Sequence, residues 1–199
     1  MTSPRRSPTS PASAASAADP VGRHRLRPVR AADAPAVLAA HRSAADMARQ
    51  GTVTDLDQAR EQVAWLLAED RRAIAIADGA DTLVGLVAVS IDVADRRGWF
   101  FYWLHAAHRG RGLAARAAAA VAERALSPIA DGGWGLERLE LGHRANNPAS
   151  GRVSRAAGFV HEGTERAKFL IDGERCDVLT YGRLVTDPAP ATAGLPWRS

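Results

Sequence analysis

The sequence predicts a mixed α/β domain with a mostly antiparallel sheet flanked by helices. Three observations support this fold class. Two segments near the N-terminus have helical periodicity. Three short apolar segments then follow one another, separated by turn residues, as in consecutive hairpins. The second half alternates between helix and strand patterns. At 199 residues the chain is expected to hold one domain with a sizeable core.

The N-terminal part of the domain is expected to contain one strand and two helices. The strand pattern is an alternation of apolar and charged residues. Asp33 is placed to cap the first helix, and Leu56, Val63 and Leu66 give the second helix an apolar stripe. The expected elements are a strand at residues 25–30, a helix from Asp33 to about Ala48, and a helix from Thr54 or Asp55 to Glu69.

Three strands are expected next, at residues 73–77, 83–92 and 99–106. Asp78-Gly79 separates the first two strands, and residues 95–98 separate the second from the third. Connections this short join antiparallel neighbours. The middle of the chain therefore predicts a meander of three strands.

The second half adds two helices and three strands, for a sheet of about seven strands in all. Pro128 and Gly158 mark helix ends, Pro148 is suited to begin a helix, and Asp172-Gly173 is a strong hairpin signal. The expected elements are a helix at 112–126, a loop at 131–135, a strand at 136–142, a helix from Pro148 to before Gly158, and strands at 159–171 and 175–184.

Composition predicts a tail at each end of the domain and no membrane-spanning segment. Residues 1–22 are rich in Ser, Ala and Pro and lack the apolar stretch of a secretory signal, so a disordered tail is expected there. The domain is expected at 23–185, followed by a fraying C-terminal tail at 186–199. Hydrophobic residues make up 46% of the chain, but no run approaches the roughly 20 needed to span a bilayer, so no membrane contact is expected.

The cysteine count and the charge distribution exclude some kinds of site and partner. The single cysteine, Cys176, excludes an internal disulfide and a cysteine-rich zinc site, so no metal and a cytoplasmic location are expected. The net charge of +4 comes from the first 30 residues, which hold six arginines and one acid. Nucleic acid is therefore not expected as a partner of the domain.

A glycine-rich turn lies between the strand at 99–106 and the helix at 112–126. It reads Arg109-Gly110-Arg111-Gly112-Leu113-Ala114. Glycine lets the backbone approach a ligand closely, and the unpaired N–H groups of a helix N-terminus attract a pyrophosphate. The turn follows antiparallel strands rather than opening a parallel βαβ unit, which argues against a dinucleotide-binding fold. No Gly-Lys-Ser/Thr follows, which excludes a P-loop.

A second motif follows at Asn147, Ser150 and Val153, with Gly158-Phe159 closing the short helix. With these two motifs in this order, residues 24–185 resemble the GNAT acetyltransferases, in particular the RimJ/RimL-like N-acetyltransferases. The resemblance implies the GNAT fold, whose mixed sheet has a central parallel split, here between residues 99–106 and 136–143. It also implies acetyl-CoA as co-substrate.

The resemblance places the pyrophosphate of acetyl-CoA on the amides of the glycine turn and the pantetheine arm along the split. Asn147 is expected to hold the cofactor or the acceptor from the other side. The residues expected to bind the cofactor are Leu104, His105, Arg109, Gly110, Arg111, Gly112, Leu113, Ala114 and Asn147.

Transfer of an acetyl group needs a proton donor for the leaving thiolate and a neutral amine. No tyrosine lies in residues 145–158, and Ser150 matches the serine proposed for the first role in RimL-like enzymes. The alternative is that Ser150 only caps its helix. Glu140 and His143 are the candidates for the general base, with Glu162 and His105 also open.

The acceptor is expected to be a primary amine, either a protein N-terminus or a small molecule such as an amino acid or drug. Trp103 and Asp177 are the candidate acceptor contacts. A binding-class alternative is a non-catalytic acyl-CoA sensor. A homodimer is also compatible with the sequence.

Overall fold

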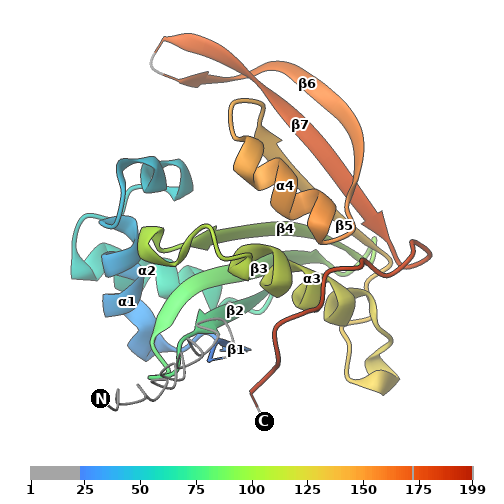
Figure 1. Cartoon of the computed structure of the whole chain (residues 1–199), viewed down its shortest axis with the longest axis horizontal. Helices are drawn as coiled ribbons and strands as arrows, with labels where there is room; N and C mark the ends of the chain where they lie inside the picture. The colour runs from blue at the N-terminus through green and yellow to red at the C-terminus, as the bar shows by residue number, and fades with distance from the viewer. Residues whose placement is uncertain (1–22, 172, 199) are drawn as a thin grey trace, which may run out of the picture.

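The computed structural model describes residues 23–171 and 173–198. The expected fold class is confirmed: a mixed sheet has helices on both faces, with α1 and α2 on one side and α3 on the other (Figure 1). The strands are β1 (Arg25–Pro28), β2 (Arg71–Ala77), β3 (Leu83–Asp92), β4 (Arg97–Leu104), β5 (Arg138–Arg144), β6 (Val160–Ile171) and β7 (Glu174–Leu184). The α-helices are α1 (Ala34–His41), α2 (Leu56–Leu66), α3 (Leu113–Leu126) and α4 (Pro148–Ala156).

The seven strands lie in the order β1-β2-β3-β4-β5-β7-β6. Every neighbouring pair is antiparallel except β4 and β5. These two run parallel and pair only where Arg97–Trp99 meets Arg138–Glu140. Beyond that point β4 continues along β3 and β5 continues along β7, so the two strands part. This confirms the expected parallel split in the middle of the sheet.

The core is divided between the two faces of the sheet. One cluster packs α3 against the sheet, and the other packs α1 and α2 against the opposite face. Helix α3 is rich in alanine on its buried side, where Ala117, Ala122 and Ala125 are fully buried. Small side chains let a helix lie close to a sheet, so α3 comes near the strands that lead into the glycine turn.

The first helix is shorter than expected. We predicted one helix from Asp33 to about Ala48, but α1 ends at His41 and a separate 3₁₀ helix, η2, covers Ala45–Gln50. The Ser43 hydroxyl donates to the Ala40 carbonyl (2.6 Å) and accepts from the Ala106 N–H (3.0 Å). A hydroxyl that binds a local carbonyl competes with the helical hydrogen bonds, and here it also ties the chain to the segment after β4.

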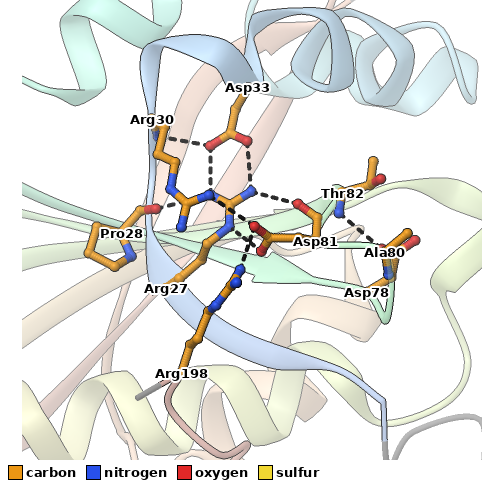
Figure 2. A network of polar contacts seen from close by, with 9 residues as sticks. All are labelled: Arg27, Pro28, Arg30, Asp33, Asp78, Ala80, Asp81, Thr82 and Arg198. Carbon is orange, nitrogen blue, oxygen red and sulfur yellow. Dashed lines mark hydrogen bonds and ion pairs between the residues drawn. The ribbon is translucent and has the colours of Figure 1, made fainter.

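Asp33 is the N-cap residue of α1, as expected, but its carboxylate makes no hydrogen bond to the first turn of that helix. Instead it accepts from the Arg30 N–H and from both terminal nitrogens of Arg27, each at 2.8 Å. The Arg27 side chain is only 2% exposed and also reaches Asp81, which further binds Arg30 and Arg198 (Figure 2). Burial of the guanidinium is thus compensated by two carboxylates.

The C-terminal segment does not fray as expected over its described residues. Leu195 is buried in the core, and the backbone of Leu26 in β1 bonds to the Pro196 carbonyl (2.9 Å) and to the Arg198 N–H (2.8 Å). Trp197 forms a parallel bridge with Leu26. The segment therefore covers the free edge of β1. The tail expected at 1–22 lies outside the described residues.

No helix among the described residues is long and apolar enough to cross a bilayer. The remaining differences between expected and observed ends are one to a few residues, as at α2, which begins at Leu56 after its cap Asp55 and ends at Leu66 rather than Glu69.

Asp81→Asn is expected to loosen the C-terminal segment, because it removes the charge that Arg27, Arg30 and Arg198 share. Hydrogen exchange should become faster at the Leu26 and Arg198 amides. Asp57→Asn, which breaks only an exposed pair within α2, serves as the control. Unchanged exchange at both amides would contradict this role.

The same contact predicts a pH dependence. Hydrogen bonds from Arg198 and Arg27 hold the pKa of Asp81 well below its usual value. The stabilisation is therefore fully present above about pH 4, the unfolded pKa of Asp, and declines as the pH falls towards the folded pKa. Thermal unfolding of the wild type and of Asp81→Asn should converge on acidification, as measured by circular dichroism.

Candidate active site

The glycine turn joins β4 to α3 and presents unused backbone donors. Gly110 and Gly112 have φ of +76° and +72°, which glycine adopts without strain. A Cβ at either position would meet nothing within 4 Å, so open space lies in front of the turn. None of the N–H groups of residues 110–115 donates to another described residue. These N–H groups form an anion cradle at the N-terminus of α3.

The Arg109 side chain turns away from the cradle. Its terminal nitrogen binds both carboxylate oxygens of Asp46 in η2 at 2.9 Å, and its Nε donates to the Leu104 carbonyl at 3.1 Å. These contacts fix the turn against η2, and the role of Arg109 in cofactor binding stays a prediction. Among the described residues, Arg111 forms no ion pair.

Leu104 and His105 differ in what their backbones offer. The His105 N–H donates to the Val84 carbonyl in β3 (2.9 Å), and its carbonyl accepts from His108 (2.9 Å). Successive residues of a strand direct their N–H groups to opposite edges, so the Leu104 N–H points towards the split. Of the two residues expected to pair with pantetheine, only Leu104 presents a free edge group.

A cavity of about 210 Å³ lies where β4 and β5 part. Side chains from η2, β4, β5, α4 and β6 form its wall, and no Asp or Glu is among them. The lining residues are Arg49, Gln50, Trp99, Phe100, Phe101, Tyr102, Leu141, Gly142, His143, Arg144, Asn147, Ser150 and Phe169.

Tyr102 and Ser150 meet in this cavity. The Tyr102 hydroxyl is 2.7 Å from Ser150 Oγ and 3.0 Å from the Ser150 carbonyl, and 3.3 Å from Ser154 Oγ. Ser154 also donates to the Ser150 carbonyl at 3.0 Å. Burial raises the pKa of the Tyr102 phenol, against the opposing effect of the two serine hydroxyls. The phenol therefore stays protonated at neutral pH.

Ser150 does not cap α4. Asn147 is the cap, with Oδ1 accepting from the Ser150 N–H at 3.2 Å, and Pro148 occupies the first turn. The Ser150 hydroxyl is thereby left for the cavity and for Tyr102. Asn147 lines the same cavity, so capping and ligand contact are both compatible with its position.

The two candidate bases lie in unequal surroundings. Glu140 accepts from Arg138 Nε (2.8 Å) and from Arg97 (3.3 Å), which lower its carboxyl pKa, and it does not line the cavity. His143 lines the cavity and stacks on Tyr181. Its Nδ1 lies 2.9 Å from the Arg144 carbonyl, which can only accept, so Nδ1 carries a hydrogen.

His143 Nε2 is buried and has no hydrogen-bond partner among the described residues. The backbone of Gly151 covers it so closely that a Cβ there would lie 3.0 Å from Nε2. Of the other candidates, Glu162 pairs with Arg138, and His105 accepts from the Ala107 N–H. None of these four groups directs an accessible lone pair into the cavity.

Trp103 and Asp177 do not line the cavity. Trp103 is buried beneath α1 and α2, where its ring packs edge-on against His41. Alternation along β4 explains this, because Tyr102 and Trp103 point to opposite faces. Asp177 accepts from the Ala167 N–H (2.7 Å), holding a bulge of β6 in which Ala167 has φ of +54°.

Sequence reasoning missed Tyr102, Arg49, Arg144 and Phe169. Tyr102 lies outside residues 145–158 and reaches Ser150 from the facing strand β4. The sequence does contain a signal for Tyr102. The expected split places its strand opposite the segment of Ser150, so the two side chains could be expected to meet. The two arginines and Phe169 carry no motif.

Comparison with known proteins identifies the family. Residues 23–160 match the acetyltransferase (GNAT) domain model. The chain belongs to this family. It is an acetyl-CoA-dependent GNAT acetyltransferase, which confirms the expected recognition, enzyme class and co-substrate.

One curated relative of this GNAT domain is a ribosomal-protein acetyltransferase. A ribosomal-protein-serine acetyltransferase of Escherichia coli (strain K12) is 31% identical over 107 residues, which cover 53% of this chain and 56% of that protein. The match thus spans about half the length of the curated relative.

Two solved structures share the fold. A ribosomal L7/L12 alpha-N-protein acetyltransferase in complex with coenzyme A is 21% identical, with a TM-score of 0.67 over 83% of this chain and 97% of that one. A dodecameric spermidine N-acetyltransferase from Vibrio cholerae is 22% identical, with a TM-score of 0.64 over 82% and 95%.

The residues present fit acetyl-CoA. The unpaired amides of the cradle suit a pyrophosphate, and the open Leu104 edge suits an amide-bearing arm that pairs like a strand. The split then leads from the cradle to the cavity that holds Tyr102 and Ser150.

Gly112→Val is expected to weaken coenzyme A binding by about tenfold or more, because a β-branched residue resists the left-handed φ of +72° that the cradle needs. Isothermal titration calorimetry measures the dissociation constant. Gly132→Val is the control, since Gly132 has a similar φ of +77° and open space but lies in the loop after α3. Equal affinity in both variants would contradict the assignment of the cradle.

Proposed function

We propose that this GNAT enzyme acetylates the α-amine of a protein or peptide N-terminus. The observation that carries the proposal is the Tyr102–Ser150 pair in the cavity where β4 and β5 part. Acetyl-CoA supplies the acetyl group as a thioester. Its pyrophosphate is held by the cradle at residues 110–115, and the Leu104 N–H aligns the arm.

Ser150 and Tyr102 act as a two-step proton relay in this proposal. A serine hydroxyl is a poor acid, but Ser150 Oγ lies 2.7 Å from the Tyr102 hydroxyl. When Tyr102 donates to Ser150 Oγ, the Ser150 hydrogen is free to point to the leaving sulfur. A phenol is a stronger acid than an aliphatic hydroxyl, and the raised pKa of the buried Tyr102 keeps its proton in place until the thiolate forms, so Tyr102 is the effective proton source.

The acceptor amine is proposed to enter neutral rather than to be deprotonated by an enzyme carboxylate. Glu140 is engaged by arginines, and His143 Nε2 lies under Gly151. Arg49 and Arg144 in the cavity wall disfavour a second positive charge, so they lower the pKa of a bound amine. Placing this amine beside the thioester then supplies much of the rate.

An N-terminal α-amine suits this cavity better than a polyamine. Its lining contains arginines and no carboxylate, and a polyamine brings several cations. The relative acting on a ribosomal-protein serine agrees with this choice. The small volume of about 210 Å³ also favours the alternative of a small acceptor such as an amino acid. A non-catalytic acyl-CoA sensor would bind coenzyme A without thiol release in the presence of any amine.

Tyr102→Phe and Ser150→Ala are each expected to lower kcat about 100-fold while the dissociation constant of coenzyme A changes little, because only proton transfer is lost. Thiol release from acetyl-CoA with a peptide acceptor measures the rate. Tyr181→Phe is the control, since this second buried tyrosine does not line the cavity. A wild-type rate in both Tyr102→Phe and Ser150→Ala would contradict the proposed relay.

The pH profile of kcat/KM should follow the acceptor rather than the enzyme. With a peptide α-amine the rate should rise up to about pH 8, and with a lysine-like amine the rise should extend towards about pH 10. Glu140→Gln should leave both profiles unmoved, because the pKa of Glu140 is already held low by Arg138. A single profile for both amines would indicate an enzyme base.

A further inference from the structure

The acceptor side of the cavity is a cationic wall. Arg49 comes from η2 and Arg144 from the end of β5, with Phe169 of β6 beside them. The Arg144 guanidinium carbon lies 5.7 Å from the centre of the Phe169 ring, within the range of a cation–π contact. This contact leaves the in-plane N–H donors of Arg144 available to a ligand.

No described carboxylate neutralises this wall. Within residues 23–171 and 173–198, neither Arg49 nor Arg144 has an acidic group within 4.0 Å. The carboxylates on the nearest elements have other partners. Asp46 binds Arg109, Glu140 binds Arg138, and Asp177 accepts from the Ala167 N–H. Two arginines facing a cavity without a counter-charge favour an anionic ligand group.

We infer that the acceptor carries a carboxylate close to its amine, which the Arg49–Arg144 wall recognises. This inference rests on the proposed function and narrows its substrate class. A planar guanidinium binds a carboxylate through parallel N–H donors, and this pairing is geometrically specific. Arg49 and Arg144 line the same cavity as Ser150, so the carboxylate lies within the first residues of the acceptor.

Asp177 is a positioning residue for this wall. Its carboxylate holds the Ala167 N–H, and the bulge between Glu165 and Phe169 resets the register so that Phe169 pairs opposite Cys176. The bulge thereby sets the location of the Phe169 ring, which in turn lies under Arg144.

The test compares matched acceptors in the full chain. Peptides that begin Ser-Asp and Ser-Asn differ by one charge and little in shape. We expect kcat/KM for thiol release to be about 10- to 100-fold higher with the acidic peptide, the range for a lost charged hydrogen bond. Arg144→Gln should abolish this preference, whereas Arg144→Lys should restore part of it. Arg72→Gln, a remote exposed arginine on β2, should retain it in full.

The outcomes separate the two proposals. Equal rates with both peptides, or a preference that survives both Arg144→Gln and Arg49→Gln, would overturn the anionic acceptor while leaving N-terminal acetylation intact. Thiol release with neither peptide would overturn the proposed function and this inference with it. Retention of the preference in Asp177→Ala would separately remove the positioning role of Asp177.

Discussion

The short parallel pairing of β4 with β5 is the constraint on which the rest of this enzyme depends. The two strands share hydrogen bonds only from Arg97–Trp99 to Arg138–Glu140, and each then follows its antiparallel neighbour. The strand that leaves the pair on one side runs into the glycine cradle, and the one on the other side runs into α4. The glycine cradle and Tyr102 therefore lie on the β4 side of one opening, and Ser150 reaches Tyr102 from the β5 side.

Burial on both sides of the sheet makes this opening rigid. β3 and β4 lie between two cores, one under α3 and one under α1 and α2. Close-packed side chains resist displacement, so the edge of β4 is held open without a partner strand. Tyr102 benefits from the same packing, since its hydroxyl is fixed between Ser150 and Ser154 rather than exposed to solvent.

Sequence alone supplied the strands, the glycine cradle and the family, because each leaves a local pattern in the chain. Alternation and turn residues predict hairpins, and Gly110 and Gly112 mark the left-handed turn. It misplaced groups whose roles depend on distant partners. The Asp33 carboxylate binds Arg27 and the Arg30 N–H rather than the first turn of α1. Trp103 packs into the core because alternation along β4 directs Tyr102, not Trp103, to the cavity. The burial of Leu195 leaves no pattern in the sequence, because one apolar residue among Pro, Ala and Gly has no periodicity.

The break in the first helix has a wider consequence. The Ser43 hydroxyl, just before η2, accepts a hydrogen bond from the Ala106 N–H, and Asp46 within η2 pairs with Arg109. Two contacts therefore hold η2 against the segment that leads into the cradle. The same η2 sends Arg49 and Gln50 into the cavity wall. η2 therefore connects the cradle to the cavity wall. If a ligand at the cradle orders η2, it must favour binding at the wall, because the coupling free energy between two sites is reciprocal.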